Sequence, residues 1–182
     1  MRRKQNKFLS LAGSCLIPLG VGGLSYLLTG KAAMNRYAGM PKPPLAPPGW
    51  VFPAVWSVLY VLMGVSAWRV GRRRDRRGVW GPYGLQLTLN CAWSPVFFRL
   101  GRPWAALGIL GALEGCILWM IARFSRADRA AGRLQIPYAL WVAFAGYLNF
   151  MIAKGQNAVE KPLRWVFLDR GVPPCGPVSP FF

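Results

Sequence analysis

Long stretches of apolar residues, each bounded by Arg or Lys, dominate the chain. They cover residues 8 to 28, 50 to 70, 80 to 98, 104 to 121 and 134 to 153. A helix rises about 1.5 Å per residue, so about 20 apolar residues span the roughly 30 Å hydrocarbon layer of a bilayer. The pattern therefore predicts an all-α membrane protein with five transmembrane helices.

The first apolar stretch follows a basic start and has to be distinguished from a secretory signal peptide. The apolar part of a signal peptide is only about 7 to 15 residues long and ends at a cleavage site with small residues. The stretch over residues 8 to 28 is longer. We interpret it as the first membrane span.

Two proline-rich segments lie outside the predicted spans. Residues 29 to 49 contain five prolines, a density that predicts a long loop without a regular helix. Residues 158 to 182 are again rich in proline and show no periodic apolar face, which predicts a flexible tail. The membrane domain is expected to cover residues 1 to 157.

The large positive charge of the chain is consistent with a membrane protein. The chain has 23 Lys and Arg against 5 Asp and Glu, a net charge of +18. The basic residues lie almost wholly between the apolar stretches, where anionic lipid headgroups explain them, so nucleic-acid binding is not expected. Their larger share falls on the side of the N-terminus, which the positive-inside rule assigns to the inner face of the membrane.

The inventory of reactive residues narrows the function further. Histidine is absent, which excludes Ser-His-Asp triads, Cys-His nucleophiles and His-ligated zinc. The four cysteines form no C-x-x-C pair, and most of them lie in apolar stretches, where cysteine behaves as a small hydrophobe. We expect neither a disulfide framework nor a metal site.

Aromatic and amide side chains recur at helical spacing in the second, third and fifth apolar stretches. An unpaired Asn in hydrocarbon costs a few kcal/mol, so these faces are expected to point inward, around a pocket among spans one, two, three and five. Such a pocket suits a large flat apolar ligand with polar edges. Similar stripes also hold helices together, and the spacing alone leaves both readings open. The faces consist of Trp56, Tyr60 and Met63, then Gln86, Asn90, Trp93 and Phe97, and finally Trp141, Ala145, Leu148 and Asn149.

Three segments together resemble the translocator protein family, also known as TspO/MBR or the peripheral-type benzodiazepine receptor. They are PPGWVFPAVWSVLY at residues 47 to 60, LNCAWSPVFF at 89 to 98 and PYALWVAFAGYLNF at 137 to 150. The likeness covers about residues 8 to 157 and is closer to bacterial members. It implies a five-helix membrane bundle, commonly dimeric, whose pocket takes porphyrins, heme-related tetrapyrroles and cholesterol. Protoporphyrin IX or heme is the expected ligand, bound without a covalent link, with membrane lipid and a second copy as further partners.

The resemblance also assigns residues. Those at positions similar to the family's ligand pocket are Trp56, Tyr60, Asn90, Trp141, Ala145 and Leu148, with Trp104 as a further wall residue, and Trp93 joins them from its stripe. Trp56 and Trp141 match the two tryptophans implicated in light- and oxygen-dependent porphyrin breakdown, and they are the candidate catalytic residues.

One departure from the family pattern bears on the ligand. Phe150 stands where the animal proteins have the tyrosine of their cholesterol motif, although Lys154 remains. Porphyrin binding for sensing, sequestration or transport is therefore the favoured function. The alternatives are photo-oxidative porphyrin breakdown and transport of cholesterol or another small molecule. A bacterial cell membrane is favoured over a mitochondrial outer membrane.

The fourth span carries two further features. Gly111 and Gly115 form a G-x-x-x-G motif, which serves either a dimer seam or packing within the chain. Glu114 is the acidic residue inside a span, and it either has a proton or ligand role or pairs with an arginine from a loop.

Overall fold

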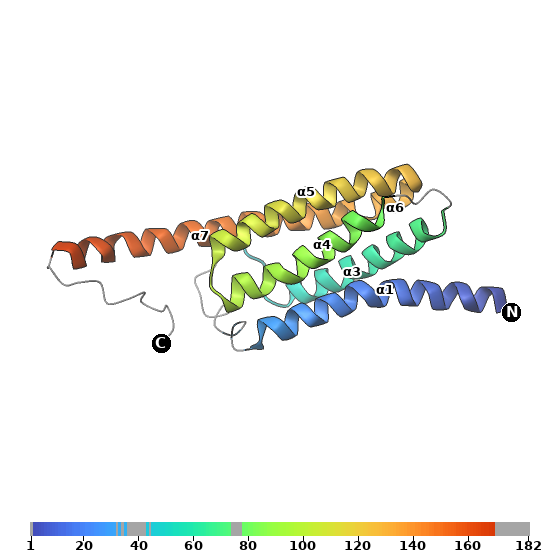
Figure 1. The fold of residues 1–182 in the computed structure, drawn as a ribbon. Coiled ribbons are helices and arrows are strands. Elements are labelled where there is room, and N and C mark those ends of the chain that lie inside the picture. Colours follow the sequence, from blue (N-terminus) through green and yellow to red (C-terminus); the bar gives the residue numbers. More distant parts are fainter. Residues whose placement is uncertain are drawn as a thin grey trace.

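A computed structural model describes residues 2 to 169, apart from 32, 34, 36 to 42, 44 and 74 to 77, with side chains between residues 9 and 155. Helices account for nearly all of this part of the chain (Figure 1). They are α1 (Arg2–Thr29), α3 (Val51–Gly71), α4 (Trp80–Ser94), the π-helix η1 (Pro95–Arg99), α5 (Pro103–Ala127), α6 (Arg129–Arg133) and α7 (Ile136–Asp169).

The predicted all-α membrane bundle is confirmed. Four segments are long and apolar enough to cross a membrane: Leu9–Thr29, Val51–Gly71, Pro103–Ala127 and Arg129–Gly155. The remaining predicted span covers residues 80 to 98. α4 alone has only 15 residues, and η1 continues directly from it through this span. Together the two elements supply a fifth crossing of about the length that a bilayer requires.

The change from α-helix to π-helix at the end of α4 has an identifiable cause. Pro95 has no backbone N–H, so the carbonyl of Cys91 loses its helical partner. Ser25 of α1 donates its hydroxyl to that carbonyl at 3.1 Å. The backbone continues with wider turns, in which the Leu100 N–H donates to the Pro95 carbonyl at 3.0 Å. A polar side chain of one helix thus satisfies a backbone group of another inside the membrane.

The junction between the fourth and fifth spans differs from the sequence prediction. α5 continues to Ala127, beyond the predicted end at 121, and the separate short helix α6 follows. Asp128 lies between them in an extended conformation and caps α6 by accepting the N–H groups of Ala130 and Ala131. Charged residues at the membrane surface can continue a helix. Hydropathy therefore indicated where the fourth span leaves the membrane, but not where α5 ends.

The boundary of the predicted tail also differs. α7 continues to Asp169, past residue 158, where the sequence predicted an irregular segment. Residues 158 to 169 contain a single proline, Pro162, and each added helical residue gains a hydrogen bond, so helix can propagate there. Residues 170 to 182, which the prediction also assigned to the tail, lie outside the described residues.

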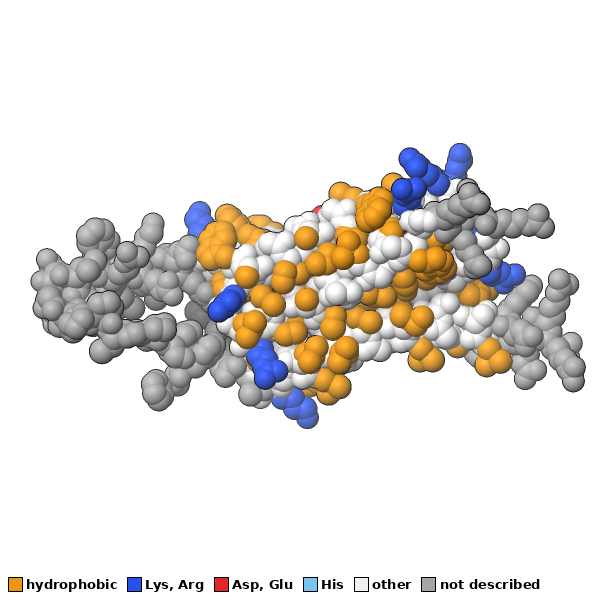
Figure 2. Space-filling view, in the orientation of Figure 1, with side chains coloured by type: hydrophobic (Ala, Val, Ile, Leu, Met, Phe, Trp, Pro, Cys, Tyr) orange, Lys and Arg blue, Asp and Glu red, His pale blue; other side chains and the backbone are white. Residues whose placement is uncertain are grey.

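The helices pack as an elongated bundle with the N-terminus of α1 and α6 at the same end (Figure 1). α1 packs against α3 and α4, α4 against α5, and α5 against α7. Figure 2 shows Lys and Arg side chains near both ends of the described bundle and hydrophobic side chains over its middle. Leu16, Leu27 and Leu140 are each more than half exposed, as expected of side chains that face lipid.

The two features of the fourth span fall on α5. A Cβ added at Gly111 or Gly115 would meet nothing within 4 Å, so these glycines do not serve close packing within the described part of the chain. Glu114 pairs with no arginine among the described residues, and its buried Oε2 has no hydrogen-bond partner there.

Candidate functional site

A cavity of about 600 Å³ lies among α1, α3 and α4, and Asn35, Pro47 and Gly49 of the 29–49 connection also line it. Its volume is in the range of small-molecule sites, which is roughly 300 to 1,000 Å³. Small polar groups, among them Ser57 and Ser94, are placed around a wall made mainly of rings. The aromatic lining residues are Tyr26, Phe52, Trp56, Tyr60, Trp93 and Phe98.

The rings of the wall are packed against one another. Trp56 and Tyr60 lie one turn apart on α3 and stack, with ring centroids 5.4 Å apart and planes 29° apart. Trp93 and Phe98 meet edge to face at 5.8 Å. Aromatic pairs at such distances stabilise each other by about 0.5 to 1.5 kcal/mol beyond the burial of their surface. The wall is therefore preformed.

Close approach of α1 to α3 determines where the Tyr60 ring lies. A Cβ on Gly22 would stand only 2.3 Å from Cε2 of Tyr60, so only glycine leaves room for the ring at this position. One turn further along α3, Gly64 leaves the same kind of room, because a Cβ there would stand 2.4 Å from the Cα of Cys15. The glycines of the first and second spans thus allow the helices to meet closely.

A chain of hydrogen bonds holds the polar side of the cavity. The Tyr60 hydroxyl donates to Oδ1 of Asn90 at 2.9 Å, and the Asn90 amide donates to the Tyr138 hydroxyl at 3.1 Å. Tyr138 in turn donates to Oε1 of Gln86 at 2.9 Å. All four side chains are buried. The network joins α3, α4 and α7 and fixes the orientation of Tyr60 and Asn90, which line the cavity.

The structure brings four of the eight predicted ligand residues together. Trp56, Tyr60, Asn90 and Trp93 all line the cavity. The other four do not appear in its lining: Trp104, Trp141, Ala145 and Leu148. The cavity lies among spans one, two and three, whereas the sequence pattern had included span five.

The α7 residues occupy a layer behind the cavity. Trp141 meets the lining residue Phe52 edge to face at 5.8 Å, and its buried Nε1 has no partner among the described residues. Ala145 and Leu148 are buried between helices. Asn149 donates its amide to the Pro103 carbonyl at 2.7 Å, so the polar member of this face joins α7 to α5. The face matches the helix-packing reading of such stripes.

Trp104 stands apart from the other predicted site residues. It is at the start of α5, is 48% exposed and meets Phe150 edge to face at 6.2 Å. Its ring is at the end of the bundle, where aromatic residues commonly occupy the membrane interface.

The sequence predicted that the first span borders the pocket but identified none of its lining residues. Gly22, Gly23, Ser25 and Tyr26 of α1 all line the cavity. The dense glycines of the first span were the available signal, because glycine in a membrane helix marks close approach. The glycines did not reveal which group lies against Gly22, and in the structure that group is the ring of Tyr60.

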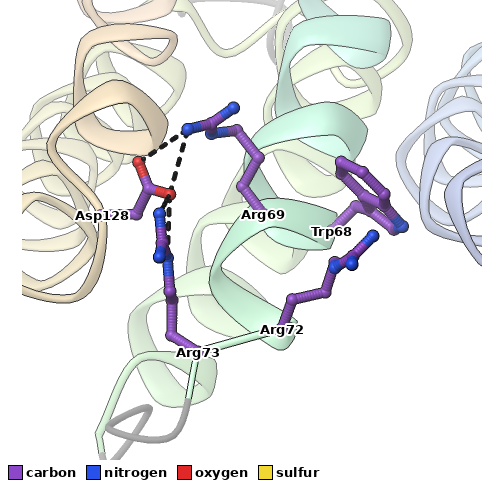
Figure 3. A pocket seen from close by; sticks show the side chains of 5 residues that line it. All are labelled: Trp68, Arg69, Arg72, Arg73 and Asp128. Carbon is purple, nitrogen blue, oxygen red and sulfur yellow. Dashed lines mark hydrogen bonds and ion pairs between the residues drawn. The ribbon is translucent and has the colours of Figure 1, made fainter.

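A cluster of charges lies at the other end of α3 and shares no residue with the lining of the cavity. Figure 3 shows its side chains, among them Arg69, Arg73 and Asp128. The Asp128 carboxylate accepts hydrogen bonds from Arg69, at 3.1 and 3.2 Å, and from Arg73. Burial by itself raises the pKa of this carboxyl, but the hydrogen bonds from Arg73, from the Ala131 N–H and from Arg69 outweigh burial and lower the pKa to about 2. Asp128 is therefore ionised at neutral pH and ties α3 to the junction of α5 and α6.

Comparison with known proteins shows similarity over most of the chain. The model of the TspO/MBR family matches residues 14–154. The tryptophan-rich protein TspO of Chlorobaculum tepidum is 35% identical over 150 residues, which cover 80% of this chain and 95% of the relative. The tryptophan-rich sensory protein of Cereibacter sphaeroides is 33% identical over 143 residues, 79% of this chain and 87% of the relative. The translocator protein of Bos taurus is 32% identical over 143 residues, 76% and 85% of the two chains.

The fold and the site define an integral membrane protein in which a five-span helical bundle encloses an aromatic cavity. The family match extends over all five spans, and the relatives are similar over most of their own length. The chain belongs to the TspO/MBR family.

Proposed function

We propose that this protein binds porphyrins and related tetrapyrroles, as well as other flat hydrophobic molecules, in the cavity among α1, α3 and α4. The observation that carries the proposal is the preformed wall of stacked rings beside a fixed polar edge. Trp56 and Tyr60 offer a continuous aromatic surface to the face of a planar ligand. Asn90 and the serines of the lining offer hydrogen-bonding groups to its edge.

The position of the cavity supports a ligand that partitions into the membrane. Most of the lining belongs to α1, α3 and α4, so a molecule in the cavity exchanges contact with lipid chains for contact with rings. That exchange gains little from the hydrophobic effect alone, because hydrocarbon is as apolar as the rings. Selectivity then depends on stacking and on the polar groups, and both favour a planar aromatic ligand over a saturated one.

The test is a titration of the purified protein with protoporphyrin IX, followed by quenching of tryptophan fluorescence. Replacing Trp56 with Phe removes part of the stacking surface and is expected to weaken binding by about 1 kcal/mol, about fivefold in Kd. Trp119→Phe is the matched control, since Trp119 is 46% exposed on α5 and is not part of the lining. Absence of saturable quenching, or equal affinity of the Trp56→Phe and Trp119→Phe proteins, would contradict the proposal.

Two further variants test whether ligand binding depends on the residues that line the cavity or on those that the family resemblance implies. Trp141 and Trp104 are predicted ligand residues that do not line the cavity. Trp104→Phe is expected to leave the affinity unchanged. Trp141→Phe is expected to have a smaller effect than Trp56→Phe, because Trp141 acts only by supporting Phe52 from behind.

Light-driven oxidative breakdown of the bound porphyrin by molecular oxygen is the second candidate function. It is supported by the placement of Trp56, a readily oxidised ring in the cavity wall, in stacking contact with the phenol of Tyr60. Illumination of the porphyrin complex in air tests it, with products followed by absorption and mass spectrometry. Unchanged turnover by Trp56→Phe at saturating porphyrin would exclude this role for Trp56.

The biological use of binding is proposed to be sensing or sequestration, in a bacterial cell membrane and as a homodimer. The similarity to a protein named a tryptophan-rich sensory protein supports the first part. Flux of porphyrin across proteoliposomes distinguishes transport from binding without transport.

A further inference from the structure

The end of the bundle opposite the aromatic cavity contains a second hollow, of about 290 Å³. It is lined by Trp68, Arg69, Arg72, Arg73 and Asp128, and we name it the arginine hollow (Figure 3). We propose that the arginine hollow binds a phosphate group, and specifically the headgroup phosphate of an anionic membrane lipid. This site is separate from the aromatic cavity and does not depend on what the cavity binds.

The charges of the hollow leave a positive excess after its one carboxylate is paired. Asp128 accepts bonds from the N–H groups of Ala130 and Ala131 in addition to those from Arg69 and Arg73. Its negative charge is thus already compensated by two guanidinium groups and a helix N-terminus. Since three arginines line the hollow, an entering anion meets a net positive charge.

Arg72 is the arginine that the Asp128 pairing does not use. Its guanidinium lies over the Trp68 ring, 4.8 Å from the centroid, and it makes no ion pair with the carboxylates that the structure describes. Trp68 is itself held in place, because its Nε1 donates to the Ser10 hydroxyl of α1 at 3.0 Å. Stacking restrains the guanidinium by its face, and its N–H edge has no carboxylate partner among the described residues, the arrangement that suits bidentate contact with phosphate oxygens.

The hollow lies at the depth of lipid headgroups. The membrane-spanning part of α3 ends at Gly71, so Arg72 and Arg73 come directly after it. The apolar stretch of α1 begins directly after Lys7, close to Ser10. The start of the α1 span and the end of the α3 span therefore lie at the same membrane surface. A tryptophan beside arginines at that level is typical of a membrane interface.

Several physical terms favour a lipid phosphate at this position. Anionic lipids are concentrated in the leaflet, and each Lys or Arg near its surface contributes about 1 kcal/mol of attraction. Guanidinium groups match phosphate oxygens in geometry as well as charge. A zwitterionic headgroup carries a choline cation, which the positive excess repels. The hollow should therefore prefer phosphatidylglycerol to phosphatidylcholine.

The experiment is a native mass spectrometry titration of the full-length protein in detergent. Three probes are compared: dioctanoyl phosphatidylglycerol, dioctanoyl phosphatidylcholine and inorganic phosphate. Arg72→Gln removes one guanidinium without touching the bonds of Asp128. Arg126→Gln is the matched control, because Arg126 is exposed on α5 at the same end of the bundle and does not line the hollow.

The expected result is saturable binding of phosphatidylglycerol in preference to phosphatidylcholine, weakened about fivefold by Arg72→Gln and unchanged by Arg126→Gln. An unchanged thermal midpoint of Arg72→Gln shows that the variant is folded. Equal loss in both variants, or equal binding of the two lipids, overturns the proposal, because positive charge at the surface would then explain the binding. Inorganic phosphate binding as tightly as the lipid would overturn the assignment to a headgroup and make the ligand a soluble anion.

Discussion

Replacing Asp128 with Asn removes one negative charge from the junction of α5 and α6 and changes little else. The Asn side chain keeps an oxygen that can accept the N–H groups of Ala130 and Ala131, so the cap of α6 is retained. Arg69 and Arg73 lose their anionic partner. The variant therefore isolates the ionic contribution of Asp128 to the stability of the bundle.

The pKa of Asp128 gives the size of that contribution. The folded structure lowers it from 3.8 to about 2, and the difference corresponds to about 2.4 kcal/mol of preference for the charged form. The side chains of Arg69 and Arg73 are 36% and 52% exposed, so solvent screening reduces the effect. We expect Asp128→Asn to lower the free energy of unfolding by about 1 to 2 kcal/mol. In a chain of this length the thermal midpoint should then fall by about 2 to 8 °C.

The loss should depend on pH with a defined sign. The folded pKa lies below the unfolded one, so the stabilisation is fully present above about pH 4. As the pH falls from about 4 through about 2, the carboxyl is protonated in the folded state and the stabilisation disappears. Wild type and Asp128→Asn should therefore differ at pH 7 and converge near pH 2.

The assay is thermal unfolding of the purified protein in detergent, followed by intrinsic fluorescence at pH 7 and at low pH. Asp128→Ala also removes the helix cap, which should lower stability by about a further 1 kcal/mol at pH 7. Arg126→Gln controls for a charge change at the same end of the bundle. Equal midpoints of wild type and Asp128→Asn at pH 7, or a gap of the same size at both pH values, would refute the reasoning.

Two other predictions concern glycines at the contact of α1 and α3. Gly64→Ala pushes a methyl group into the backbone at Cys15 and should lower the thermal midpoint, because overpacking costs about 1 to 3 kcal/mol while alanine regains about 1 kcal/mol of helix propensity. Gly22→Ala instead meets the ring of Tyr60, a side chain rather than the backbone, so a titration should show weaker porphyrin binding with a smaller change in midpoint. Gly20→Ala is the control for both, because its Cβ would meet nothing within 4 Å. A control that behaves like either variant would show that helix contact is not the cause.

Hydropathy was sufficient to predict where the membrane spans lie. Its errors concern the residues at which the helices end. The predicted starts at 50, 80 and 104 fall within one residue of α3, α4 and α5. Partition into hydrocarbon depends on composition over about 20 residues, a property that the sequence contains in full. Where a helix ends outside the membrane depends instead on local hydrogen bonds, such as the cap at Asp128, and composition does not show those.

The candidate site was predicted only in part, for a different reason. Trp56, Tyr60, Asn90 and Trp93 were expected in a pocket and line one. Trp141 was expected there on equal grounds and lies behind Phe52. In water a polar face and an apolar face reveal which side of a helix is inside, but in lipid both sides are apolar, so spacing alone cannot orient the helix.

Residue order alone was enough to establish a five-span membrane bundle of the TspO/MBR type, because the apolar stretches and the family motifs are both properties of the sequence. The tertiary structure decided which faces meet. Gly22 admits the Tyr60 ring, and the hydrogen bonds from Tyr60 through Asn90 to Tyr138 turn three helices toward one another. These contacts join residues far apart in the chain, and their energies depend on distances that exist only after the helices have packed.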